Sequence, residues 1–136
     1  MMKVYKKSYL GFWLWMLGFC LACTGCIFLP EMDVQIILAI IDNIMTIGVF
    51  ILTLIIYLTE CIYWYNGTSF EAAAAAGSVR RKRFAFAHMK RFGLFALVFL
   101  LYNVLSIVIG IPWGVDIAVV LVGIVGVALS TLKIKL

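Results

Sequence analysis

The chain has 136 residues, of which 66% are hydrophobic and only 12% are charged. Soluble domains contain about 25% charged and about 45–50% apolar residues, and a chain of this length has too much surface for its volume to bury the excess. The composition therefore excludes a single soluble domain, a disordered chain and a secreted disulfide scaffold. It indicates an all-α, polytopic membrane protein with one transmembrane domain over residues 1–136.

Four apolar segments are long enough to cross a bilayer, whose hydrocarbon core of about 30 Å requires about 20 helical residues. The predicted spans cover residues 8–29, 38–65, 92–111 and 115–132. Short outer turns join the first span to the second and the third to the fourth. A basic cytoplasmic loop, about residues 66–91, joins the middle two. The sequence thus predicts a four-transmembrane-helix bundle.

The basic residues predict the orientation of these spans. Every Lys and Arg lies in residues 3–7, 80–91 or 133–135, and an even number of spans places these three groups on one side. The opposite turns carry only Glu31, Asp33 and Asp116. The positive-inside rule then predicts that both termini are cytoplasmic, in a bacterial-type inner membrane or a plasma membrane.

The basic residues of the loop are expected to attract anionic lipid headgroups. The alternative, a nucleic-acid patch, is disfavoured because a span begins a few residues later, so no nucleic-acid partner is expected. The predicted lipid contacts are Arg80, Arg81, Lys82, Arg83, Lys90 and Arg91.

Small residues recur at intervals of seven within three of the predicted spans, and residues seven apart share a helix face. Lipid tails are as apolar as leucine, so small residues that permit close backbone approach are what drive helices together in a membrane. We therefore expect seams that face one another in a left-handed bundle. The predicted packing residues are Gly11, Gly18, Ala22, Gly25, Gly110, Gly123, Gly126 and Ser130.

Polar residues also follow these seams, and a carboxylate inside a span is a functional candidate. The second apolar run, residues 34–65, is longer than one span requires, so two registers are open for Asp42. It lies in the hydrocarbon core if the span starts near Val34, and at the outer rim if residues 63–65 form the cytoplasmic aromatic belt. Glu60 is expected near the basic loop. The predicted polar-interior residues are Asp42, Asn43, Thr46, Thr53, Glu60, Asn103 and Ser106.

Three cysteines lie near the outer end of the first span, and Cys23 and Cys26 have CxxC spacing. Such spacing suits thiol–disulfide exchange or a soft metal, whereas unreactive cysteines act as small buried hydrophobes. A CxxC in the first of four spans resembles small mercury-uptake membrane proteins, and an outward CxxC on a four-span bundle is similar to membrane thiol oxidases. Both resemblances rest on the motif and the span count, and they imply a redox or metal role for the pair.

No Ser/His/Asp set, HExxH motif or phosphate-binding glycine loop is present. The one histidine, His88, and six acids offer no acid–base pair, so we expect no enzyme and no cofactor. Three functions remain. The first is a small membrane protein that acts in an assembly, as a homo-oligomer or as a subunit, with membrane lipid and protein as partners. The second is an ion or solute transporter or channel, and the third is a thiol redox or soft-metal protein.

Overall fold

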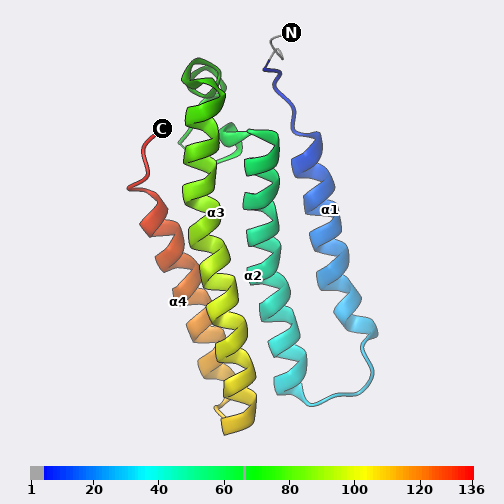
Figure 1. Ribbon diagram of the computed structural model, residues 1–136. Coiled ribbons are helices and arrows are strands. Elements are labelled where there is room, and N and C mark those ends of the chain that lie inside the picture. The colour runs from blue at the N-terminus through cyan, green and yellow to red at the C-terminus, as the bar shows by residue number, and fades with distance from the viewer. Residues whose placement is uncertain (1–4, 66) are drawn as a thin grey trace.

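The computed structural model describes residues 5–65 and 67–136 of the chain. Residues 1–4 and residue 66 lie outside this part. They include the start of the predicted N-terminal basic group, residues 3–7, and the first residue of the predicted loop. The helices are α1 (Leu10–Gly25), α2 (Val34–Thr59), α3 (Phe70–Ile109) and α4 (Trp113–Thr131), with 3₁₀ turns η1 (Cys26–Phe28) and η2 (Ile62–Trp64) (Figure 1). The described residues contain no strand, which confirms the predicted all-α class. All four helices are long and apolar enough to cross a membrane.

The four helices run alternately up and down, so the two ends of the molecule differ in charge. The α1–α2 and α3–α4 connections lie together at one end, which we call the acidic end because it carries Glu31, Asp33 and Asp116 (Figure 1). Both termini and the α2–α3 connection lie at the other end, called the basic end. The basic residues of the described chain lie toward this end.

The interior is formed by three helices rather than four. α2, α3 and α4 contact one another, whereas α1 packs mainly against α2 (Figure 1) and has no buried residue. This arrangement corrects the expectation that four seams face one interior. The physical reason lies in the sequence of α1, which contains no charged side chain and is apolar on every face. Such a helix loses nothing by remaining in lipid on most sides.

The observed ends of α2 correct the predicted second span. The helix begins at Val34 because the carboxylate of Asp33 accepts a hydrogen bond from the Gln35 backbone N–H at 2.8 Å, a strong N-terminal cap. It ends at Thr59, and Glu60 adopts a left-handed conformation with φ of 61°. The helix is therefore displaced toward the acidic end relative to the predicted residues 38–65. At 1.5 Å per residue, Asp42 lies about 12 Å along the helix from its start.

Most of the predicted loop is helical. Ser69 caps α3 by accepting a hydrogen bond from the Ala72 backbone N–H at 3.1 Å. The helix kinks at Gly77, whose φ of 74° only glycine adopts without strain, and then continues through the basic residues into the third span. Good helix formers on both sides of Gly77 explain the continuity. The α2–α3 connection is thus short, and the basic residues lie on a helix.

The apolar core of the molecule lies at the basic end, where α3 meets η2. Ile56, Ile62, Ala73 and Ala85 are almost completely buried there. The neighbouring Tyr63 is also buried, and its hydroxyl group accepts a hydrogen bond from the Ser8 N–H and donates one to the Ser8 carbonyl, each at 2.7 Å. The residue expected in a lipid-facing aromatic belt therefore holds the N-terminal segment in place.

Aromatic rings lie on glycines where consecutive helices meet. A Cβ atom added at any of these glycines would come within 2.3–2.8 Å of the ring, closer than real Cβ contacts allow. Each ring belongs to the helix that precedes the glycine's helix, so the pattern repeats along the bundle. The pairs are Phe19 on Gly48, Phe50 on Gly93 and Phe95 on Gly123. The helices thus pack ring against backbone, where the sequence analysis expected backbone against backbone.

Several predicted packing glycines have a different environment. A Cβ at Gly18, Gly25 or Gly126 would meet no atom within 4 Å. Gly110 ends α3 with a φ of 77°, and its N–H donates to the Ser106 carbonyl, so it is a helix cap. Gly110 was predicted to be a packing residue only because it lies seven residues after Asn103.

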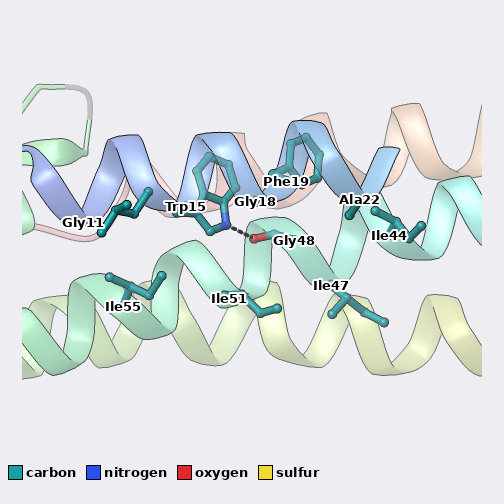
Figure 2. A pocket seen from close by; sticks show the side chains of 11 residues that line it. Gly11, Trp15, Gly18, Phe19, Ala22, Ile44, Ile47, Gly48, Ile51 and Ile55 are labelled. Carbon is teal, nitrogen blue, oxygen red and sulfur yellow. Dashed lines mark hydrogen bonds between the residues drawn. The ribbon is translucent and has the colours of Figure 1, made fainter. Parts of the chain in front are cut away.

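Gly11, Gly18 and Ala22 line an apolar groove between α1 and α2, with a volume of about 640 Å³. Figure 2 shows the Trp15 side chain reaching across this groove, where its indole N–H donates to the Gly48 carbonyl at 2.9 Å. This bond satisfies the polar atom of Trp15 in an otherwise apolar contact. Gly18 and Ala22 therefore border an open groove, whereas a Cβ atom at Gly11 would lie 3.0 Å from the Trp64 ring.

Candidate functional site

A polar face of α2 is buried against α3 and α4. Its members include Asp42, Thr46 and Thr53, with exposed fractions of 6%, 2% and 2%, as the spacing of these residues predicted. The hydroxyl groups of Thr46 and Thr53 donate to carbonyls three residues earlier in the same helix, and each keeps an acceptor site unused. The face thus presents oxygen acceptors to the interior.

Three helices bring further polar side chains together near the acidic end. The hydroxyl groups of Ser106 and Tyr102 both donate to one carboxylate oxygen of Asp116, at 2.6 and 2.9 Å. The Asn103 amide donates to the Ala39 carbonyl of α2 at 3.3 Å. We call Asp42, Asn43, Tyr102, Asn103, Ser106 and Asp116 the acidic-end cluster.

Three oxygen acceptors of this cluster are buried without a hydrogen-bond donor among the described residues. They are Oδ2 of Asp42, Oδ1 of Asn43 and Oδ1 of Asn103. The two amides converge, since both donate to the carbonyl of Ala39, at 2.8 and 3.3 Å. Asp42 follows Ala39 by three residues on α2, so both lie on the same face of that helix. Buried acceptors normally have partners, so these three oxygens are candidates to bind a hydrogen-bond donor or a cation.

Four members of this cluster were predicted from the sequence, and two were not. Asp116 was counted among the acids of the outer turns, although it lies in the first turn of α4 and is only 3% exposed. Tyr102 was not considered, although it precedes Ser106 by four residues on one helix face, a spacing that brings side chains together. The signal was therefore present for both.

A second polar region borders the interior nearer the basic end. A cavity of about 770 Å³ between α2, α3 and α4 is lined by Thr53, Tyr65, His88 and Thr131 among mostly apolar side chains. His88 is 5% exposed, and its ring stacks on that of Tyr65 at 4.3 Å between centroids. His88 therefore faces the interior, although it lies within the basic segment of residues 80–91.

Two buried apolar residues lie between the levels of this cavity and the acidic-end cluster. Phe99 lies one helical turn from Asn103 on α3, and Val120 lies one turn from Asp116 on α4. Their exposed fractions are 2% and 1%. The interior thus has polar side chains at both levels and buried apolar side chains between them.

Glu60 is not part of the acidic-end cluster, because it lies at the opposite end of α2. Its carboxylate forms an ion pair with Arg81 at 2.9 Å, and it accepts a hydrogen bond from Ser78 at 2.7 Å. Lys82 lies farther away, at 3.9 Å. The pairing expected between Glu60 and the basic segment is thus present, and it serves the fold at the basic end.

The environment of Arg81 corrects its predicted role at the lipid surface. Arg81 is 8% exposed, donates to the Ala73 carbonyl, and lies over the Tyr5 ring at 4.0 Å. Burial raises the pKa of Tyr5 to about 12, so its hydroxyl group stays protonated and donates to the Glu60 carbonyl at 2.7 Å. The Arg81 side chain is thus buried between Glu60, Ala73 and the Tyr5 ring, where a lipid phosphate does not reach it.

The cysteines show no metal site. Cys20 is exposed on α1, Cys23 and Cys26 are half-buried, and the Cys26 thiol donates to the Ala22 carbonyl. Within the described ranges, no group of three His, Cys, Asp or Glu side chains is placed to hold a metal ion. A redox role for the CxxC pair stays a prediction.

Comparisons with known proteins give no relative: no family model, no curated protein and no solved structure matches the chain. The function must therefore be argued from the geometry of the site.

Proposed function

We propose that the chain is an integral membrane protein with both termini in the cytoplasm. The charge difference between the two ends supports this orientation, because the basic end carries Arg80–Arg83 and both termini, and the acidic-end turns carry no Lys or Arg. Positive charge is retained on the cytoplasmic side. The many exposed Leu, Ile and Val side chains of α1, α3 and α4 would then contact lipid.

The same proposal includes a transport role: the chain conducts or exchanges a small monovalent cation, or a proton, through the interior of α2, α3 and α4. The observation that carries it is the surplus of buried oxygen acceptors around Asp42. Carboxylate and amide oxygens are ligands of hard cations. Of the two carboxylates in the cluster, that of Asp116 already accepts two hydrogen bonds, which leaves the Asp42 carboxylate to balance one charge of +1.

The route of the cation would follow the polar face of α2. From the acidic-end cluster it would pass Thr46 and enter the cavity beside Thr53, about 10 Å farther along the helix. Phe99 and Val120 would form the closed gate between the two levels, since both are buried there. An apolar constriction that excludes water is a known way to gate a pore.

Flux measurements on the purified full chain in liposomes test this function. Separate samples carry a sodium, potassium or proton gradient, and the flux is read with an ion-sensitive dye. We expect Asp42→Asn to reduce the flux at least about tenfold, the effect of about 1.4 kcal/mol on binding, because the amide adds a donor and removes the charge.

Asp33→Asn is the matched control, since it removes one negative charge at the same end. Asp33 is exposed and caps α2, and asparagine caps as well as aspartate does. The control should conduct like the unmodified chain. Unchanged flux in Asp42→Asn, or no flux above empty liposomes for the unmodified chain, contradicts the transport role.

Assembly is the second candidate function, in which two copies of the chain meet through α1. The observation that favours it is that α1 packs mainly on α2 and buries no residue within the chain. Cys20 is exposed on this helix, and two Cys20 residues would cross-link when their Cα atoms come within about 7 Å.

Oxidation of the full chain in native membranes tests this assembly. We expect a disulfide-linked dimer on a non-reducing gel, and we expect Cys20→Ser to abolish it. Cys61→Ser, which changes a buried cysteine at the basic end, should leave the dimer unchanged. No dimer at all, or a dimer that survives Cys20→Ser combined with Cys23→Ser, argues against α1 as the contact.

A further inference from the structure

A groove on the surface between α3 and α4 opens toward the basic end. Its volume is about 540 Å³, and Arg91, Ser130 and Lys133 line it together with apolar side chains. It is separate from the acidic-end cluster and from the interior cavity beside His88, since none of their members lines it. The groove combines a cationic mouth with an apolar channel.

The packing of α3 on α4 explains why the groove exists. The Phe95 ring lies on Gly123, which brings the two helices close at that level. Toward the termini the end of α4 lies apart from α3 (Figure 1). Arg91 crosses the resulting gap, where its guanidinium group donates to the Ser130 carbonyl.

The charges at the mouth are uncompensated by the described part of the chain. Arg91 and Lys133 are both cationic, and no carboxylate lines the groove. Of the acids toward the basic end, Glu60 is engaged by Arg81 and Ser78, and Glu71 lies in the first turn of α3, outside the groove. A guanidinium group has five N–H donors, and the hydrogen bond to Ser130 uses one of them.

The wall below the mouth is apolar. Leu94, Val98 and Val127 line it, with the Phe95 ring where the helices meet. From Arg91 to Val98 the groove runs seven residues along α3, which is about 10 Å at 1.5 Å per residue. That length matches the upper part of an acyl chain below a headgroup.

We propose that this groove binds one anionic phospholipid, with its phosphate between Arg91 and Lys133 and one acyl chain along Leu94, Val98 and Val127. Charge complementarity selects the headgroup, because two cations without an acid favour a lipid with net negative charge over a zwitterionic one. Arginine matches phosphate geometry with paired N–H donors. The sequence predicted a general contact between the basic residues of segment 80–91 and anionic lipid. The groove instead offers a defined site, formed by Arg91 of that segment and by Lys133.

Native mass spectrometry of the purified full chain tests the site, with phosphatidylglycerol and phosphatidylcholine of identical acyl chains as probes. We expect phosphatidylglycerol to bind more tightly. Lys133→Gln should weaken its binding about fivefold, the equivalent of about 1 kcal/mol for a basic residue near anionic lipid. Arg91→Gln/Lys133→Gln should weaken it further, and Arg83→Gln/Lys135→Gln, with the same charge loss on exposed positions outside the groove, should not.

Val127→Trp provides a variant that keeps both charges and fills the apolar wall, so it should also weaken phosphatidylglycerol binding. Equal weakening by the Arg83/Lys135 control overturns the proposal in favour of a general charge effect. Equal affinity for phosphatidylcholine would show an apolar groove without headgroup selection. Equal affinity for glycerol 3-phosphate would show a phosphate site that does not require the lipid.

Discussion

Arg81→Met is expected to lower the free energy of unfolding by about 3 kcal/mol, the lower part of the range for a buried ion pair that loses one partner. The substitution removes the guanidinium group from the Glu60 carboxylate, whose side chain is only 18% exposed. The charge of Glu60 then lacks its closest cation, and the Ala73 carbonyl loses a donor. A dodecyl sulfate titration of the full chain in mixed micelles, followed by circular dichroism, measures the loss.

Lys82→Met is the matched control, because it removes the same charge from the next residue. The Lys82 side chain is 54% exposed and lies 3.9 Å from the carboxylate, and exposed pairs contribute at most about 1 kcal/mol. The double variant Glu60→Gln/Arg81→Met should lose less than the sum of the single changes, since no charge is left unpaired. Equal losses for Arg81→Met and Lys82→Met would contradict the assigned role of Arg81.

The burial of the polar face of α2 could be predicted because lipid leaves polar side chains few alternatives. Asp42, Thr46 and Thr53 recur on one face of an apolar helix, and facing acyl chains would cost each of them free energy. Their positions in the interior follow from this cost. The same reasoning placed Asn103 and Ser106 in the interior from α3.

The place of α1 could not be predicted from its seam of small residues. Gly11, Gly18 and Ala22 share a face, but in lipid a face of small residues is tolerated whether it packs or not. The position of α1 is decided by the surface of α2. There the Gly48 carbonyl accepts a hydrogen bond from Trp15, and the Phe19 ring packs on the Gly48 backbone. Sequence spacing within one helix contains no information about this match.

The role of Arg81 among six clustered basic residues was also beyond the sequence. All six precede the third span, and each alone suits a lipid headgroup. The choice depends on the kink at Gly77, which brings the start of α3 back against η2 and leaves Arg81 beside Glu60. A long-range contact of this kind is fixed by the tertiary fold and has no local signature.

Gly123→Val is expected to lower the free energy of unfolding by about 2 kcal/mol, within the range for overpacked contacts. A Cβ at this position would lie 2.3 Å from the Phe95 ring, so the ring must turn away or the two helices must separate. Gly126→Val is the matched control on the same helix, because a Cβ there meets no atom within 4 Å. Its effect should stay within about 0.5 kcal/mol, as at open surface sites.

The double variant Gly123→Val/Phe95→Ala distinguishes overpacking from a general intolerance of α4 to valine. If the ring causes the loss, its removal makes room for the added methyl groups, and the double variant should be more stable than the sum of the single losses predicts. Simple additivity, or an equal loss in Gly126→Val, would contradict the ring-on-glycine contact. Because that contact also sets where α3 and α4 diverge, Gly123→Val should weaken phosphatidylglycerol binding in the groove while Gly126→Val leaves it unchanged.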